Sequence, residues 1–226
     1  MAWTEATPTY FYKMQIKIRH LIPHPLKEFG FEESMIWDKT YRFDQGKYYQ
    51  LVAASGIGKS TFINILYGIR HDYEGEVRFD QQNIRDLKEK DWTKIRNTKL
   101  GYVFQGLHLF EELSLMENIQ LKNKLTNFAS VEQIEHWIER VGLSQHLYKK
   151  TQLLSYGQRQ RIAIVRALCQ PFDFLLLDEP FSHLDKENQT LLLDLIIEEV
   201  EKQKAGIIVT SLHTITDKRI DHVVEL

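Results

Sequence analysis

The chain has 226 residues, 43% of them hydrophobic, so it is long enough for one well-packed domain with an inserted lobe but too short for several domains. Its 29 Lys and Arg against 31 Asp and Glu give a formal charge of -2, and we expect no nucleic-acid partner, because no broad basic field is present. The single cysteine, Cys169, excludes an intramolecular disulfide and a four-cysteine zinc site. Since the sequence shows neither a signal-like start nor an apolar run long enough to cross a bilayer, we expect a cytoplasmic protein.

The first half of the chain contains two kinds of predicted strand. Residues 14–19 alternate apolar and polar side chains, which is typical of a half-exposed antiparallel strand, and residues 75–80 do the same. Residues 47–53 and 100–104 are instead short, mainly apolar runs, which suit strands buried on both faces. A helix is predicted directly after the first of these runs, over residues 59–68.

The second half begins with helical patterns over residues 106–150, where we find no convincing strand. Further helices are predicted over residues 155–168 and 186–202, with short apolar runs at 172–177 and 206–210 as the intervening and following strands. Strands that alternate with helices in this way indicate a parallel α/β sheet.

These elements predict an α/β fold with a mostly parallel sheet and an antiparallel β subdomain. A helical lobe over about residues 106–165 is predicted to interrupt the core. We expect one domain over residues 13–226.

Residues 53–61 read AASGIGKST and lie between a predicted strand and a predicted helix, which is where a phosphate-binding loop is expected. Gly56 and Gly58 allow successive backbone N–H groups to point into one concavity, and the helix that follows adds its positive end. Lys59 would neutralise the β- and γ-phosphates of a nucleotide, and the Ser60 hydroxyl would ligate Mg²⁺. The residues predicted to bind the phosphates are Ser55, Gly56, Ile57, Gly58, Lys59, Ser60 and Thr61. Alternatively, this segment is a strand-to-helix turn with an incidental lysine.

A second feature is the apolar run that ends in Asp178 and Glu179. Ligands of open α/β sheets gather at the carboxyl ends of the strands, so both side chains are expected to face the phosphates. Asp178 is predicted to hold Mg²⁺, and Glu179 to orient or deprotonate the attacking water. In isolation the same residues are compatible with a solvated acidic turn after a core strand.

A third feature is the sequence LSYGQ at residues 154–158. Ser155 is placed to cap the helix that follows, and Gly157 keeps the backbone accessible, so this helix start can bind an anion. The pentapeptide resembles the LSGGQ signature motif of ATP-binding cassette (ABC) proteins. Taken alone, it is equally compatible with an ordinary capped surface helix.

The order of the motifs is also similar to that of ABC nucleotide-binding subunits, and this resemblance spans residues 48–213. In chain order the matching features are the phosphate loop, Gln105, the LSYGQ sequence, the acidic strand end, residues 182–185 (SHLD) and His213. Residues 101–121 resemble, more specifically, the ATPases of lipoprotein-releasing and macrolide-exporter systems.

The resemblance implies a P-loop NTPase core that binds ATP and Mg²⁺. Gln105 is similar to the family's glutamine that reaches Mg²⁺ and the attacking water, and His213 to the switch histidine that contacts the γ-phosphate. Asp185 is similar to the aspartate of a loop that crosses the subunit interface, while Ser155 and Gly157 would bind the γ-phosphate held by the opposite subunit. Each active site would therefore be shared by two cassettes, either two copies of this chain or this chain and a homologue, arranged head to tail.

Three residues depart from the family pattern without removing a group that does chemistry. Ala53 stands where the loop usually begins with glycine, Tyr156 replaces a glycine of the signature, and His183 replaces a small residue. Alanine is the smallest replacement available at the first position, so we expect the loop to survive.

Two further assignments rest on position relative to the family. His213 lies two residues further from its strand than the family's histidine, whose place is taken here by Ser211. The aromatic side chain that stacks on adenine is assigned to Phe29, and Phe31 is also eligible.

We expect the energy-coupling ATPase of a membrane transporter, peripheral on the inner face of the cell membrane, that moves separate integral membrane permease subunits. The alternative is a soluble ABC protein that uses an ATP-driven clamp on a protein partner. A Glu179→Gln variant that still complements would favour the clamp, because only the clamp tolerates the loss of hydrolysis.

Overall fold

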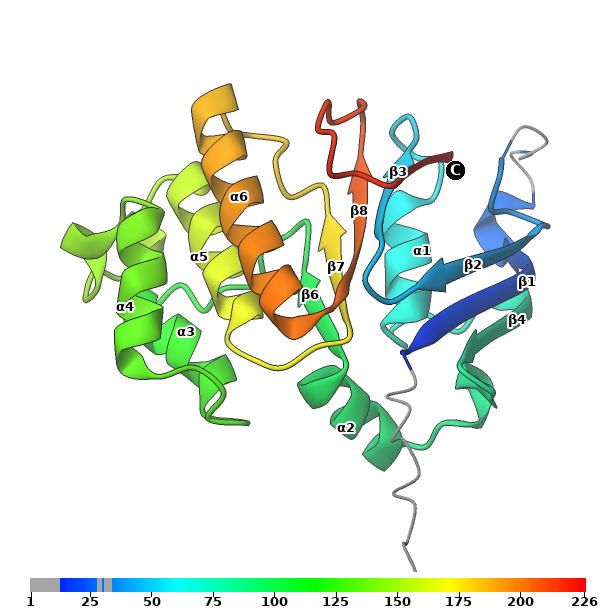
Figure 1. Cartoon of the computed structure of the whole chain (residues 1–226), viewed down its shortest axis with the longest axis horizontal. Coiled ribbons are helices and arrows are strands. Elements are labelled where there is room, and N and C mark those ends of the chain that lie inside the picture. Colours follow the sequence, from blue (N-terminus) through cyan, green and yellow to red (C-terminus); the bar gives the residue numbers. More distant parts are fainter. Residues whose placement is uncertain (1–12, 28–29, 31–33) are drawn as a thin grey trace, which may run out of the picture.

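The computed structural model describes residues 13–27, 30 and 34–226, which form two β-sheets flanked by helices (Figure 1). The strands are β1 (Gln15–Pro23), β2 (Thr40–Asp44), β3 (Tyr48–Val52), β4 (Tyr73–Phe79), β5 (Gln82–Asn83), β6 (Leu100–Val103), β7 (Phe174–Asp178), β8 (Gly206–Ser211) and β9 (His222–Glu225). The α-helices are α1 (Lys59–Leu66), α2 (Glu89–Thr98), α3 (Leu115–Asn123), α4 (Val131–Arg140), α5 (Tyr156–Leu168) and α6 (Lys186–Gln203).

The first sheet is parallel, with the strand order β6-β7-β8-β3-β9. Its inner strand β7 is buried on both faces: Leu175 and Leu177 belong to one hydrophobic cluster, and Phe174 and Leu176 to the other. Continuous apolar strands are what such double burial requires. The four apolar runs therefore form the parallel strands that the sequence predicts, and β9 joins as an unpredicted edge strand.

The second sheet is antiparallel, with the order β2-β1-β4-β5. In β1, Ile16 and Ile18 are fully buried whereas Gln15 and Lys17 are half-buried, which reproduces the alternation in the sequence. Both predicted antiparallel strands are present, and β2, which the sequence analysis did not predict, pairs with the free side of β1.

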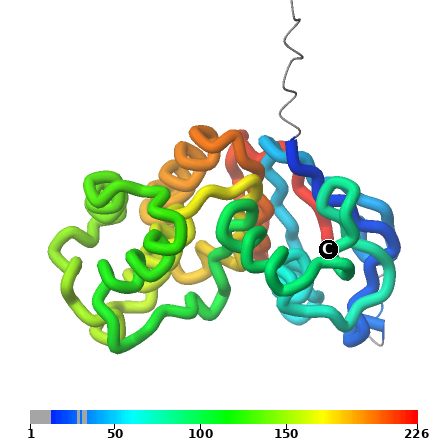
Figure 2. Tube along the Cα trace, turned by 90° about the horizontal axis from the view of Figure 1, so that it is seen from below, coloured from blue at the N-terminus to red at the C-terminus, as the bar shows by residue number. Residues whose placement is uncertain are grey.

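Between β6 and β7, the regular structure of the chain consists of helices: α3, α4, two short 3₁₀ turns and α5. These helices lie on one side of the parallel sheet and the antiparallel sheet lies on the other (Figures 1 and 2). Trp137 of α4 anchors the helical segment to the core, because its buried ring donates a hydrogen bond from Nε1 to Oε1 of Glu199 on α6 over 3.0 Å.

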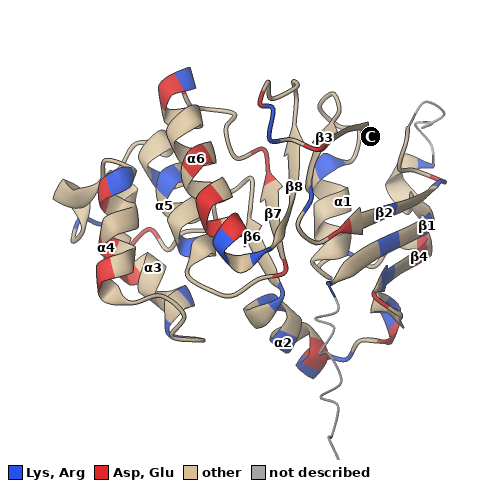
Figure 3. Cartoon of the chain, in the orientation of Figure 1, with Lys and Arg blue, Asp and Glu red and all other residues tan. Residues whose placement is uncertain are grey.

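The alternating charges of residues 85–99 predict a solvated face. In the structure this segment contains helix α2, which has one buried aromatic side chain. Trp92 packs edge-on against Phe79, with ring centroids 6.0 Å apart, and Arg96 donates to the backbone carbonyls of Tyr67 and Gly68. Figure 3 shows acidic and basic residues interspersed along the helices in that view.

Candidate functional site

The phosphate loop leaves β3 at Val52 and ends where α1 begins. Gly58 is the N-cap of α1 and has a left-handed backbone with φ of 96°; a Cβ there would lie 2.7 Å from Leu26 Cδ1 and 3.0 Å from Trp37 Cζ2. Gly56 is also left-handed, with φ of 86°, but a Cβ there would have no atom of the described residues within 4 Å. The loop is therefore packed on one side and open on the other, where its backbone can approach a phosphate.

Lys59 is the first residue of α1, and its side chain is only 4% exposed. Its Nζ donates to the carbonyl oxygens of Ala53 and Ala54, at 2.8 Å each, and lies 3.1 Å from Oε1 of Glu179. Because Ala53 accepts through its backbone carbonyl oxygen, which glycine also has, the replacement of the usual glycine does not remove this contact.

Asp178 is the last residue of β7 and is 2% exposed. Its Oδ1 accepts a hydrogen bond from Thr210 Oγ1 over 2.8 Å. Burial raises the pKa of Asp178, and the hydroxyl groups of Ser60 and Thr210 oppose this effect by bonding to the charged form.

Glu179 follows directly and has a left-handed backbone, with φ of 48°, which is strained for a residue other than glycine. Thr210 holds this conformation, since the Glu179 N–H is 3.2 Å from its carbonyl oxygen and 3.1 Å from its hydroxyl oxygen. This backbone conformation positions the Glu179 carboxylate beside Lys59, so the acidic end of β7 faces the phosphate loop.

Gln105 lies in the loop after β6, and its Oε1 accepts a hydrogen bond from Ser60 Oγ over 3.1 Å. Ser60 also lies near Asp178, where it opposes the rise in the pKa of that carboxyl. The structure thus brings together all three residues predicted to hold Mg²⁺, and each offers an oxygen atom, the ligand type that this ion prefers. Within the described ranges, His, Cys, Asp and Glu alone form no cluster that could hold a metal ion, so such a site depends on the hydroxyl and amide groups as well.

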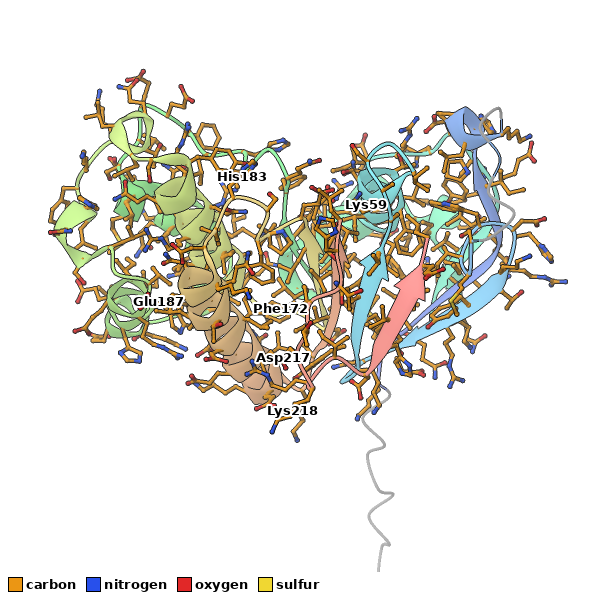
Figure 4. The ribbon with its side chains drawn as sticks, turned by 90° about the horizontal axis from the view of Figure 1, so that it is seen from above. Lys59, Phe172, His183, Glu187, Asp217 and Lys218 are labelled. Atoms are coloured by element: carbon orange, nitrogen blue, oxygen red, sulfur yellow. The ribbon has the colours of Figure 1, made fainter. Side chains whose placement is uncertain are left out.

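The signature residues lie on the helical segment. Ser155 is the N-cap of α5: its Oγ accepts from the Gln158 N–H over 3.2 Å, and Gln158 Oε1 accepts from the Ser155 N–H over 2.9 Å. Gly157 faces the loop after β7, where a Cβ would lie 3.3 Å from Leu184 Cδ2. Figure 4 shows His183, in that loop, and Lys59 on the same side of the molecule.

Three predicted site residues have less direct placements. Asp185 is exposed and caps α6 through Oδ1, which accepts from the Asn188 N–H over 2.8 Å; this bond lowers the pKa of Asp185. The His213 side chain is exposed, two residues beyond the end of β8, and its role stays a prediction. Phe29, the predicted adenine-stacking residue, lies outside the described residues.

Sequence analysis missed two polar residues that organise the site. Thr210 links Asp178 and Glu179, and Gln50 on β3 is fully buried, with its Nε2 donating to Ser211 Oγ and to the His213 carbonyl oxygen. A lone glutamine inside the apolar run KYYQLVA is a signal that could have found Gln50, because a buried amide needs partners.

A nucleotide-phosphate loop, an acidic strand end and a capped signature helix on one α/β scaffold define an ATP-binding cassette. Residues 38–182 match the family described as "ABC transporter". The chain is 40% identical over 153 residues to the lipoprotein-releasing system ATP-binding protein LolD of Hahella chejuensis, covering 65% of this chain and 66% of that protein. It is 31% identical over 224 residues to a putative hemin import ATP-binding protein, HrtA, of Staphylococcus haemolyticus, covering 94% and 97%.

Solved structures give the same result. The ATP-binding cassette MJ0796, in a dimeric post-hydrolysis state bound to ADP and Pi, superimposes with a TM-score of 0.71 at 27% identity, covering 88% of each chain. The chain belongs to the ABC transporter family of ATP-binding proteins, and its fold is that of an ABC ATPase. The predicted family and fold class are confirmed.

Proposed function

We propose that this chain is the ATP-hydrolysing subunit of an ABC transporter, in which two cassettes close head to tail on two ATP molecules and drive separate integral membrane permease subunits. The observation that carries the proposal is the ion pair between Lys59 on α1 and Glu179 at the end of β7, whose Nζ and Oε1 atoms lie 3.1 Å apart. This contact places a phosphate-binding cation and a candidate base in one site. The relatives named as transporter ATP-binding proteins, and the cassette dimer bound to ADP and Pi, support it.

In the proposed reaction the residues of this chain bind the phosphates, orient the attacking water and accept its proton. The backbone N–H groups of residues 55–61 and the Lys59 amine bind the phosphates. Ser60, Gln105 and Asp178 hold Mg²⁺, which neutralises charge on the β- and γ-phosphates when bound. Glu179 orients the attacking water and accepts its proton.

Phosphate binding competes directly with the ion pair between Lys59 and Glu179. When Lys59 turns to the β- and γ-phosphates, the Glu179 carboxylate loses its partner and becomes available to the water. The left-handed backbone of Glu179, fixed by Thr210, keeps the carboxylate beside the loop during this exchange.

The partner cassette completes each site in this proposal. Ser155 and Gly157 of one copy bind the γ-phosphate on the other, and Asp185 lies at the interface between them. His213 contacts the γ-phosphate and Phe29 stacks on adenine. The capping box of Ser155 supports the first of these assignments, because it orders the start of α5 and leaves the Ser155 side chain exposed.

We place the permease contact in a cleft of about 240 Å³ between the core and the helical segment. Its lining residues are Tyr67, Tyr102, Phe104, His108, Phe110, Leu121, Lys122, Arg166, Ala167 and Gln170. Phe110 and Leu121 are exposed there, while burial and the neighbouring Arg166 lower the pKa of Lys122 to about 8. The mixture of apolar rings and two cations suits a permease segment that carries apolar side chains and a carboxylate.

This assignment makes the chain a peripheral protein on the inner face of the cell membrane. Among the described residues, the helices lack the combination of length and apolar character that a bilayer span requires.

The proposal is tested with the Glu179→Gln variant, purified by affinity from native membranes in the presence of ATP and Mg²⁺. We expect an ATP-dependent dimer of cassettes and the recovery of an integral membrane protein. Recovery of none would refute the transporter assignment. Complementation by this variant would instead support the soluble clamp, since only a clamp functions without hydrolysis.

A further inference from the structure

Two of the residues that depart from the family pattern contact each other. Tyr156 replaces a signature glycine and His183 replaces a small residue, and their rings pack edge to face with centroids 4.6 Å apart at an interplanar angle of 80°. The Tyr156 hydroxyl also donates to the backbone carbonyl oxygen of Gln105 over 3.1 Å. A glycine at position 156 would make neither contact, so this sequence has a link between three loops that the usual signature lacks.

The same helix holds the segment after Gln105 at a second place. Arg166 of α5 donates from its two terminal nitrogens to the carbonyl oxygens of Leu107 and His108, at 2.6 Å each. Leu107 and His108 both have left-handed backbones, with φ of 60° and 47°, a conformation that costs energy and persists only where its surroundings enforce it. Helix α5 therefore holds residues 105–108 by hydrogen bonds at both ends of this segment, from Tyr156 to Gln105 and from Arg166 to Leu107 and His108.

The side chain of Gln105 extends this connection into the phosphate site. Its Oε1 accepts from Ser60 Oγ over 3.1 Å, while its backbone carbonyl oxygen accepts from Tyr156. Tyr156 itself lies between Ser155 and Gly157, the two residues that face the nucleotide of the partner cassette under the proposed function. Contacts thus continue from the signature, which meets the nucleotide of the partner cassette, through Gln105 to the Ser60 hydroxyl, which faces the nucleotide of the same chain.

We propose that Tyr156 is a positioning residue that couples the two nucleotide sites of the dimer. Its hydroxyl bonds to Gln105 in one site, so the position of Gln105 depends on how the signature binds the nucleotide in the other site. His183 supports Tyr156 by holding the ring from the side of the loop after β7. This inference rests on the proposed function, since it needs two cassettes and two nucleotides. The coupling is a difference in free energy between sites and is measured as cooperativity.

The test compares the steady-state ATPase activity of the purified full chain with that of Tyr156→Phe, which removes only the hydroxyl, over a range of ATP concentrations. We expect the parent to have a Hill coefficient above unity. In the variant the coefficient should fall to unity and kcat should drop about three- to tenfold, the range for one lost hydrogen bond. The ATP concentration at half-saturation should change less than about twofold, because the Tyr156 hydroxyl bonds to the Gln105 backbone and not to the phosphate loop of its own chain.

Tyr148→Phe is the matched control, because Tyr148 is 85% exposed on the same helical segment and the substitution is chemically identical. His183→Phe, which keeps a ring beside Tyr156, should retain the cooperativity of the parent, whereas His183→Ala should lose part of it. The double variant Tyr156→Phe/His183→Ala should be no more impaired than Tyr156→Phe alone, because His183 acts through the hydroxyl that this variant already lacks.

Failure of this inference is distinguishable from failure of the proposed function. If Glu179→Gln forms no dimer with ATP, the proposed function is wrong, whatever Tyr156→Phe does. If the dimer forms and the parent hydrolyses ATP, then either a parental Hill coefficient of unity or a Tyr156→Phe variant with parental kcat and cooperativity overturns the role of Tyr156.

Discussion

The hydroxyl of Thr210 is the part of the site whose removal has the most calculable effect. It donates to Asp178 Oδ1 over 2.8 Å and accepts from the Glu179 N–H over 3.1 Å, and Thr210 is fully buried. Thr210→Val leaves the shape nearly unchanged but strips the buried carboxylate of this donor. A hydrogen bond to a charged group contributes about 1.5–3 kcal/mol, so at neutral pH the free energy of unfolding should fall by about that amount.

The loss should depend on pH in a defined direction. Burial already raises the pKa of Asp178 above the ordinary value of 3.8, so the folded protein binds this proton more tightly than the unfolded chain does. The free energy of unfolding therefore falls as the pH rises from 3.8 through the raised pKa. Thr210→Val raises that pKa further, which enlarges the penalty above it. Below pH 3.8, where the carboxyl is neutral in both states, only the loss of a neutral hydrogen bond, about 0.5–1.5 kcal/mol, should remain.

Thermal and urea unfolding of the nucleotide-free protein measure this effect, at neutral pH and in acid. At about 2–4 °C per kcal/mol for a chain of this size, the melting temperature at neutral pH should drop by about 3–12 °C. Thr190→Val, the same change on the exposed face of α6, should alter stability by less than about 0.5 kcal/mol. A Thr210→Val protein that melts with the parent at neutral pH, or whose deficit is the same at both pH values, would refute the reasoning.

Features of the site that depend on neighbouring residues could be predicted from the sequence. The phosphate loop needs a strand, two flexible glycines and a helix start within a dozen residues, and Ser155 caps α5 through a residue three positions away. Asp178 and Glu179 follow from the rule that ligands meet parallel strands at their carboxyl ends. In each case the sequence contains the whole local arrangement.

Other features depend on strand order and register, which no local pattern specifies. Thr210 reaches Asp178 because β8 lies beside β7 with these two residues directly paired. The same register shows what stands in place of the family's histidine. Ser211 is the last residue of β8 and pairs with Val52 at the start of the phosphate loop, so the position next to the loop holds a hydroxyl rather than an imidazole.

The contact between Tyr156 and Gln105 joins residues 51 positions apart and could not be predicted for the same reason. From the sequence, Tyr156 is only a bulky residue in place of a glycine. The proposed role of Tyr156 depends on the contact of α5 with the loop after β6, which is a property of the assembled helical segment. A departure from a family motif is therefore interpretable only when the fold shows what the new side chain contacts.

Four further substitutions separate the contributions of the phosphate loop and the acidic strand end. Glu179→Gln should slow turnover by about 10²-fold or more, the scale of a lost general base, in a steady-state phosphate-release assay, and a parental rate would contradict that role. Lys59→Ala should abolish ATP binding measured by calorimetry, because it removes the amine that the carbonyl oxygens of Ala53 and Ala54 hold in the loop. Gly58→Ala and Gly56→Ala form a matched pair, since both place a Cβ on a left-handed backbone at a strain of about 1–2 kcal/mol, but only the first drives it to within 2.7 Å of Leu26. Gly58→Ala should therefore lower the unfolding temperature of the nucleotide-free protein more than Gly56→Ala does, and equal losses would show that the packing of the loop against Leu26 and Trp37 adds nothing to the strain.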